Sequence, residues 1–167
     1  MLDHLIEQLE GHRRIVLVGG PRSGKSTLAV RLSERYGLPA RHADALVGTL
    51  DWSEHSLEVS RWLEEFGDFV IEGCSTARAL RKWLERYPGA ELGSTVVWLP
   101  DAIQRRSPSQ EAMAKGVATV WAQIAPELAA RGTTVLGPQV IATDPPEAQP
   151  APTSAPAGPR HPSILVT

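Results

Sequence analysis

One stretch near the N-terminus constrains this chain more than any other, the segment IVLVGGPRSGKSTL at residues 15–28. It begins with four consecutive apolar residues, which is typical of a buried strand, and continues into a glycine-rich loop and helix-forming residues. The loop matches the pattern G-x-x-x-x-G-K-[ST] over residues 19–26 without a departure. In such loops, backbone N–H groups and the positive end of the next helix bind phosphate oxygens. The stretch therefore predicts a strand, a phosphate-binding loop and a helix.

The residues of this loop have separate expected parts in binding a nucleoside triphosphate. Lys25 places a full charge between the β- and γ-phosphates, and Ser26 offers a hydroxyl to Mg²⁺. A glycine-rich turn that matches by chance is the alternative, but it leaves the strand before and the helix after unexplained. The residues predicted to hold the triphosphate are Gly19, Gly20, Pro21, Arg22, Ser23, Gly24, Lys25, Ser26 and Thr27.

Helix and strand patterns alternate along the rest of the chain. Apolar residues at helical spacing predict helices over residues 1–11, 28–36, 52–66 and 77–87, and Asp51 with Glu54 caps the third of them. The apolar face of that third helix is expected to contain Trp52, Val59, Trp62, Leu63 and Phe66. Residues 107–131 are also expected to be helical, with interruptions at Gly116 and Pro126.

Strands are predicted over residues 15–18, 40–44, 68–72, 95–99 and 133–136. Because these strands alternate with helices, the connections should be right-handed crossovers. The sequence therefore predicts an α/β fold with a parallel sheet covered by helices on both faces.

Length and charge narrow the class of protein. At 167 residues with a formal net charge of −2, the chain fits one domain, and its whole surface makes no case for binding nucleic acid or membranes. The single cysteine, Cys74, excludes an internal disulfide, and we interpret it as a small buried residue rather than a reactive thiol. There is no leader pattern and no apolar run near the ~20 residues of a membrane span, so we expect a soluble, cytoplasmic protein.

The composition changes after Gly137, where prolines recur among Ala, Ser and Thr. Such a segment buries too little apolar surface to offset its ordering entropy. We expect a folded domain over residues 1–143 and a flexible tail over residues 144–167. The apolar end of that tail, residues 164–166, either stays unstructured or docks on a groove or another subunit, and the oligomeric state is left open.

Two acids end predicted strands, at the edge where ligands bind in open α/β sheets. Asp44 is placed to accept the proton of a substrate hydroxyl, although an Asp there also caps turns. His42 shares its face if the run is extended, as a weaker candidate with a structural role as the alternative. Glu72 ends an apolar strand and could reach the Mg²⁺ shell, whereas a P-loop protein usually has Asp at its metal-organising position.

Cations gather after two of the predicted strands. Arg78, Arg81 and Lys82 share one helix face, where guanidinium groups suit phosphate oxygens and an exposed charged face is the alternative. Arg105 and Arg106 lie in an irregular segment after the fourth strand. That segment either closes on a nucleotide and neutralises the transferring phosphoryl group, or is a solvated loop.

The string GGPRSGKSTLA, the small size and the arginine-bearing segment together resemble the nucleoside and nucleotide kinase branch of the P-loop NTPases. That resemblance implies a three-layer fold with a five-stranded parallel sheet in the order 2-3-1-4-5, an acceptor site under the second and third helices, and an arginine lid. More narrowly, VGGPRSGKST, HAD, VIEGCSTARALRKWL and AMAKGVATVW are similar to small phage-type kinases that phosphorylate 5-hydroxymethylpyrimidines in DNA. The chain departs from adenylate-type kinases, because it lacks their D-G-x-P-R string and a clear final helix.

The resulting hypothesis is an ATP- and Mg²⁺-dependent kinase whose acceptor hydroxyl belongs to a nucleoside or to a modified base in DNA. Its predicted catalytic residues are Lys25, Asp44, Glu72, Arg105 and Arg106, its metal ligands Ser26 and Glu72, and its substrate-binding residues His42, Asp44, Arg78, Arg81 and Lys82. A DNA acceptor also requires Arg41 to join Arg78, Arg81 and Lys82 in one basic groove. The alternative is a small P-loop ATPase or a nucleotide-switched binding module without an acceptor.

Overall fold

The computed structural model describes residues 2–137. The predicted tail over residues 144–167, its apolar end and the domain boundary at residue 143 lie outside the described residues. Among the described residues, no helix is both long enough and apolar enough to cross a membrane.

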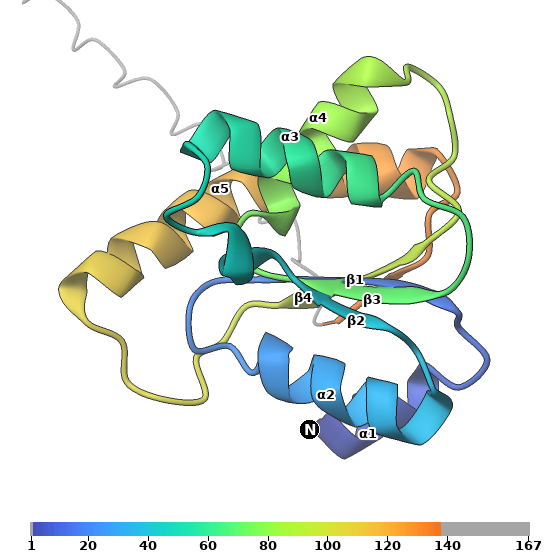
Figure 1. Ribbon diagram of the computed structural model, residues 1–167, viewed down its shortest axis with the longest axis horizontal. Helices are drawn as coiled ribbons and strands as arrows, with labels where there is room; N and C mark the ends of the chain where they lie inside the picture. The colour runs from blue at the N-terminus through green and yellow to red at the C-terminus, as the bar shows by residue number, and fades with distance from the viewer. Residues whose placement is uncertain (1, 138–167) are drawn as a thin grey trace, which may run out of the picture.

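The described chain is a three-layer α/β fold (Figure 1). Five parallel strands form the middle layer in the order β2-β3-β1-β4-β5, as the resemblance implied. The strands are β1 (Arg14–Gly19), β2 (Ala40–His42), β3 (Phe69–Glu72), β4 (Thr95–Leu99) and β5 (Val135–Leu136). The helices are α1 (Leu2–Gln8), α2 (Lys25–Tyr36), α3 (Trp52–Trp62), α4 (Thr76–Arg86) and α5 (Pro108–Ala130), and η1 (Ala43–Leu46) is a 3-10 turn.

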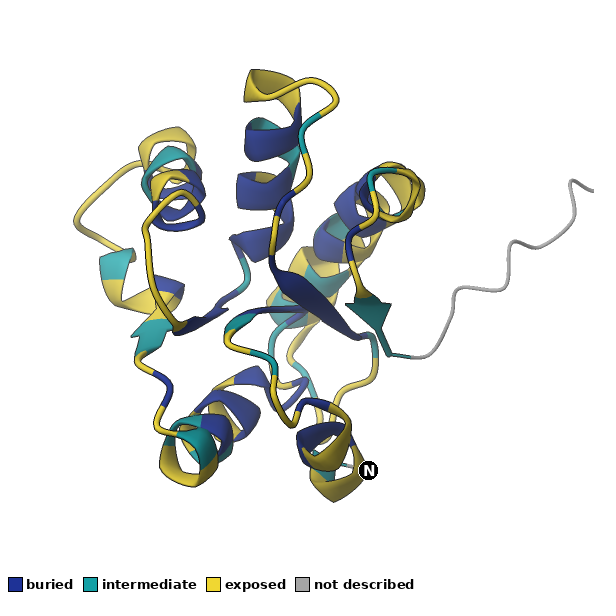
Figure 2. Cartoon of the chain, turned by 90° about the vertical axis from the view of Figure 1, so that its right-hand side faces the viewer, coloured by how far each residue is buried: buried dark blue, intermediate teal, exposed yellow. Residues whose placement is uncertain are grey.

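The central strand β1 has an apolar core on each face, because its side chains alternate between them. Val16 and Val18 pack into the core beneath α3, α4 and α5, whereas Ile15 and Leu17 pack into the core above α1 and α2. All of these side chains are fully buried. Figure 2 shows the same division, since the buried side of each helix faces the sheet. A strand buried on both faces fixes the phosphate loop at its end on a rigid base.

Helix α1 covers the sheet beside α2 (Figure 1). Leu5, Ile6 and Leu9 are buried and join the core that contains Leu28 and Val97. Among the described residues no helix follows β5, so the N-terminal helix closes this face of the molecule.

The structure corrects three details of the sequence prediction. The second strand ends at His42, and Asp44 lies in η1 rather than in the strand. Helix α5 is continuous through Gly116 and Pro126, because a row of buried side chains that includes Trp121 and Leu128 anchors it to the core. Two residues predicted for the apolar face of α3 are exposed: Phe66 lies beyond the end of the helix at Trp62, and Trp52, the first residue of the helix, is 47% exposed.

Candidate functional site

The loop between β1 and α2 has the geometry of an anion cradle. Helix α2 begins at Lys25 after Gly24, which supplies no side-chain cap, so N–H groups of the first helical turn remain open to a ligand. Lys25 is 5% exposed, and its Nζ donates to the Gly20 carbonyl oxygen at 2.7 Å and lies 3.4 Å from the Ser23 hydroxyl. The ammonium group is thus folded over the loop, where phosphate oxygens would meet it.

Glu72 lies beside this loop because β3 is the neighbour of β1, with Leu17 and Glu72 in register. Its Oε1 accepts from the Ser26 hydroxyl at 3.2 Å and lies 2.7 Å from His42 Nδ1. The carboxylate is 2% exposed, and its buried Oε2 has no hydrogen-bond partner within residues 2–137. A buried carboxylate oxygen without a partner, next to a hydroxyl of the phosphate loop, fits a Mg²⁺ ion, which prefers oxygen ligands.

Asp44 approaches the same edge through the end of β3. Its Oδ1 accepts from the Cys74 backbone N–H at 3.3 Å. A Cβ atom at Gly73 would lie 2.6 Å from Ala43 Cβ and 3.2 Å from Asp44 Oδ1, so only glycine permits this approach. Asp44 is exposed, and it is therefore accessible to a substrate hydroxyl next to the phosphate loop.

Cys74 joins the phosphate loop to a neighbouring pocket. Its Sγ lies 4.0 Å from Lys25 Nζ, and the residue is only partly buried. Burial raises the pKa of the Cys74 thiol, and the charge of Lys25 offsets part of that effect. The thiol therefore stays protonated at neutral pH and contributes a weakly polar wall rather than a nucleophile.

A pocket of about 350 Å³ opens from Cys74 between three helices, and we call it the α3–α4–α5 pocket. Its lining is mostly apolar, with one indole and one guanidinium group: Trp52, Cys74, Ala77, Arg78, Ala112, Met113, Gly116 and Val117. Sequence reasoning missed Cys74, Trp52 and Met113 as site residues. The available signal was the position of Cys74 directly after the Glu72-Gly73 strand end. For Trp52 and Met113 the sequence offered none, because their place depends on how α3 and α5 pack.

The segment after β4 lies on the phosphate loop. The backbone N–H of Ile103 donates to the Arg22 carbonyl oxygen at 2.8 Å, and Arg106 Nε donates to the Pro21 carbonyl oxygen at 2.6 Å. The Arg106 side chain is 8% exposed, Glu111 lies 3.8 Å from its Nη1, and its buried Nη2 has no partner in the described part of the chain. Arg105 lies exposed on the same segment. The structure thus brings Arg106 to the loop and leaves Arg105 facing solvent.

The first turns of α5 also press on the phosphate loop. A Cβ atom added at Gly20 would lie 2.7 Å from Ala114 Cβ and 3.1 Å from Arg106 Nη2. The Arg22 side chain donates to Gln104 at 2.8 Å and to Gln110 at 3.2 Å. These contacts place one wall of the α3–α4–α5 pocket next to the loop.

The predicted acceptor-side cations are not gathered in one groove. Arg41 pairs with Glu65 and lies over the Trp62 ring, 4.5 Å from its centroid, at the far end of α3. Arg81 lies 3.9 Å from Glu85, and Lys82 donates to the Ser53 carbonyl oxygen at 3.2 Å. Of the four cations that a DNA acceptor was expected to require, the α3–α4–α5 pocket contains Arg78 alone.

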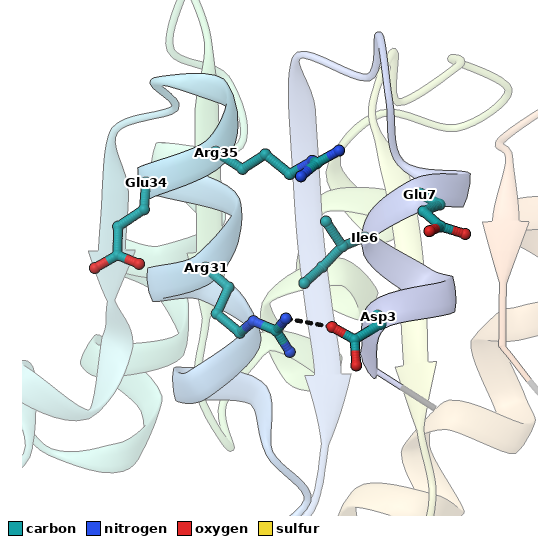
Figure 3. A pocket seen from close by; sticks show the side chains of 6 residues that line it. All are labelled: Asp3, Ile6, Glu7, Arg31, Glu34 and Arg35. Atoms are coloured by element: carbon teal, nitrogen blue, oxygen red, sulfur yellow. Dashed lines mark hydrogen bonds and ion pairs between the residues drawn. The ribbon is translucent and has the colours of Figure 1, made fainter.

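A pocket of similar volume, about 370 Å³, lies between α1 and α2 (Figure 3). Its lining residues are Asp3, Ile6, Glu7, Arg31, Glu34 and Arg35, none of which belongs to the phosphate loop. Arg31 pairs with Asp3 across it, and this hydrogen bond lowers the pKa of the Asp3 carboxyl. Of the six lining residues, Arg31 and Asp3 are the pair that hydrogen-bonds (Figure 3), and the pocket lies apart from the phosphate loop, so we assign no function to it.

Comparisons of the sequence with known proteins find no match, and comparison of the structure finds similar solved structures. No protein-family model matches the chain, and no curated protein matches it. Among solved structures, the chain is similar to shikimate kinase from Acinetobacter baumannii in complex with shikimate, at 14% identity and a TM-score of 0.46, over 80% of this chain and 88% of that one. It is also similar to shikimate kinase from Bacteroides thetaiotaomicron, at 18% identity and a TM-score of 0.45, over 76% of this chain and 87% of that one.

Proposed function

We propose that this chain is an ATP- and Mg²⁺-dependent kinase that transfers the γ-phosphoryl group to a hydroxyl of an acceptor in the α3–α4–α5 pocket. The observation that carries the proposal is the meeting of two sites at Cys74. Its Sγ lies 4.0 Å from Lys25 in the phosphate loop, and its backbone N–H holds Asp44 at 3.3 Å. A phosphate site, a candidate base and an acceptor pocket therefore share one edge of the sheet.

The residues of this edge divide the reaction between them. The loop N–H groups and Lys25 would hold the triphosphate, and the Asp44 carboxylate would accept the proton of the acceptor hydroxyl. The acceptor oxygen then bonds to the γ-phosphorus while the bond from that phosphorus to the bridging oxygen breaks and ADP departs. Arg106, whose buried Nη2 has no partner among residues 2–137, is placed to donate to the transferring group, with Arg105 nearby on the same segment.

Mg²⁺, when bound, would neutralise phosphate charge, and Ser26 and Glu72 would hold it. The Glu72 carboxylate already accepts from the Ser26 hydroxyl at 3.2 Å, and its second oxygen, which has no hydrogen-bond partner among residues 2–137, could face a metal or a metal-bound water. His42 orients the carboxylate through its Nδ1.

A nucleoside-like acceptor is supported by the apolar walls of the pocket and by the indole of Trp52 at its rim. A 5-hydroxymethylpyrimidine within DNA has no such support, because Arg41, Arg81 and Lys82 are engaged with local partners. The hydroxymethylated strand therefore enters the experiment as one acceptor among several.

Transfer of label from γ-labelled ATP tests the proposal. The full chain is incubated with Mg²⁺ and a panel of nucleosides, nucleotides, small hydroxy acids and hydroxymethylated DNA. We expect label on at least one acceptor, and we expect Lys25→Ala to lower that transfer by roughly 100-fold or more, since it removes a charge from the transferring group. Arg86→Met, on an exposed ion pair of α4, serves as the control and should transfer label normally.

Two outcomes would contradict the kinase. Wild-type rates in Lys25→Ala would show that the loop does not bind the reacting phosphates. ATP hydrolysis that proceeds equally without any hydroxyl acceptor would instead favour the ATPase or switch alternative.

A further inference from the structure

Arg78 is the one cation among the described residues that line the α3–α4–α5 pocket, and an aromatic ring rather than a carboxylate holds it. Its Cζ lies 5.9 Å from the centroid of the Trp52 ring. Among residues 2–137, no Asp or Glu lies within ion-pair distance of Arg78. A cation–π contact orients a guanidinium group without neutralising it. The positive charge at the rim of the pocket is therefore left for a ligand.

The neighbouring cations of α4, unlike Arg78, have polar or charged partners nearby. Arg81, three residues further along α4, lies 3.9 Å from Glu85, and Lys82 donates to the Ser53 carbonyl oxygen and hydroxyl. A polymer with many phosphates is bound by many free cations, whereas the part of this pocket that the structure describes offers one. One free guanidinium group beside apolar walls fits a small molecule with a single anionic group.

The far wall of the pocket is kept open by a glycine in the middle of α5. Gly116 lines the pocket, and a Cβ atom built on it would meet nothing within 4 Å. Glycine inside a helix is less favourable than alanine. Gly116 therefore leaves space in the pocket at a cost in helix stability, and a side chain there would enter that space without a clash.

Resting on the proposed function, we infer that the acceptor is a small hydroxyl compound that carries its own carboxylate or phosphate, bound by Arg78 in the space beside Gly116. The volume of about 350 Å³ agrees with a compact ligand, since pockets for small molecules span roughly 300–1,000 Å³. The anionic group would anchor the molecule at the rim, and its hydroxyl would point past Cys74 toward Asp44 and Lys25.

Calorimetric titration of the full chain tests this binding without turnover. The probes are two pairs whose members differ by one anionic group: 3-(hydroxymethyl)benzoate against benzyl alcohol, and 5-hydroxymethyl-deoxyuridine monophosphate against its nucleoside. The first pair reports a carboxylate and the second a phosphate. We expect the anionic member of at least one pair to bind about tenfold tighter or more than its neutral partner, as a charge-assisted hydrogen bond predicts.

Matched variants assign the site. Arg78→Met should remove the preference for the anionic probe, whereas Arg86→Met, on the same helix, should keep it. Gly116→Leu should weaken binding of the same probe about tenfold or more by filling the pocket. Ala118→Leu adds the same side chain at an exposed position of α5 and should leave binding unchanged. Circular dichroism of each variant confirms that it is folded.

Several results would overturn the inference. They are equal binding of charged and neutral probes, an undiminished preference in Arg78→Met, no binding of either anionic probe at millimolar concentration, or tighter binding of a hydroxymethylated oligonucleotide than of the monophosphate. Binding through Arg78 with no label transferred to any acceptor would instead contradict the proposed kinase and would support the anion-binding site. The two failures are therefore distinguishable.

Discussion

The Glu72 carboxylate depends on His42 for its orientation, and this contact gives a prediction for a single residue. His42 Nδ1 lies 2.7 Å from Glu72 Oε1. We assign His42 no direct contact with the phosphates. Residues that orient a metal ligand usually contribute roughly 10- to 100-fold to metal affinity. We expect His42→Ala to raise the Mg²⁺ concentration needed for half-maximal turnover by that factor, and His42→Asn, which can still donate, to recover part of it.

The matched control is His12→Ala. His12 Nδ1 lies 2.6 Å from the Thr95 hydroxyl at the opposite end of the sheet, so the Mg²⁺ dependence of this variant should equal that of the wild type. An unchanged Mg²⁺ requirement in His42→Ala would show that His42 does not position Glu72 for the metal.

The Cys74 thiol gives a prediction for pH. Its pKa is raised by burial, so iodoacetamide should label native Cys74 more slowly than the same thiol in urea, with acceleration only above the ordinary thiol range of about 8.5. Because the native pKa lies above the unfolded one, the thiol contributes stability that is present below the unfolded value and lost as pH rises through the native one. Mass spectrometry of labelling against pH checks this, and identical profiles in native and urea-treated protein would contradict it.

At the residue scale, the sequence predicted what is encoded in consecutive positions. The loop from Gly19 to Thr27 and the carboxylate of Glu72 lie where the pattern placed them, because a strand end and a helix start are local features. Trp52, Cys74 and Gly116 come together only through packing of α5 against α3 and α4, and one sequence without related sequences contains no signal for such pairs. The roles of all these residues remain predictions.

Helix α5 gives a prediction at the scale of an element. Pro126 is exposed inside the helix, where it removes a backbone hydrogen bond. Pro126→Ala should therefore increase the free energy of unfolding by about 1–3 kcal/mol, measured by urea denaturation, without changing label transfer. No gain in stability would mean that the helix accommodates the proline without strain.

Helix propensity explains why the sequence predicted interruptions in this helix. The start of α3 was predicted correctly, whereas its end lies at Trp62 rather than at residue 66. Asp51 and Glu54 form the expected capping box of α3, since such a cap depends on neighbours in the chain. For α5, the burial of Trp121, Ile124 and Leu128 outweighs the cost of Gly116 and Pro126. The local sequence of a helix does not reveal tertiary packing of this kind, because the packing partners lie far away in the chain.

At the scale of the whole molecule, α1 and the turn after it close the core between the sheet and α2. Leu9 is fully buried against the core that includes Leu28 and Leu32. Leu9→Ala should lower the free energy of unfolding by about 2–5 kcal/mol, as truncation of a buried leucine usually does. Urea denaturation checks this, with Val30→Ala as the control, because Val30 is 45% exposed on α2. Equal losses in the two variants would show that Leu9, in the turn directly after α1, contributes no more to this core than an exposed side chain.

The order of the strands was expected from resemblance to a family, and the structure confirms it. Alternating patterns alone predicted only a parallel sheet with covered faces, because local sequence does not state which strands are neighbours. The lead-in helix was predicted, but its place beside α2 was not, since that contact joins distant parts of the chain.

The close approach at Gly73 has a practical consequence for anyone who would redesign this protein. The walls of the pocket are side chains, so they can be exchanged for others of a different shape. The contact between η1 and Gly73 cannot be changed in that way, because the space beside the Gly73 Cα atom admits a hydrogen atom but no Cβ atom. New acceptors can therefore be sought by remodelling the pocket, whereas the backbone fixes the position of Asp44 relative to the phosphate loop.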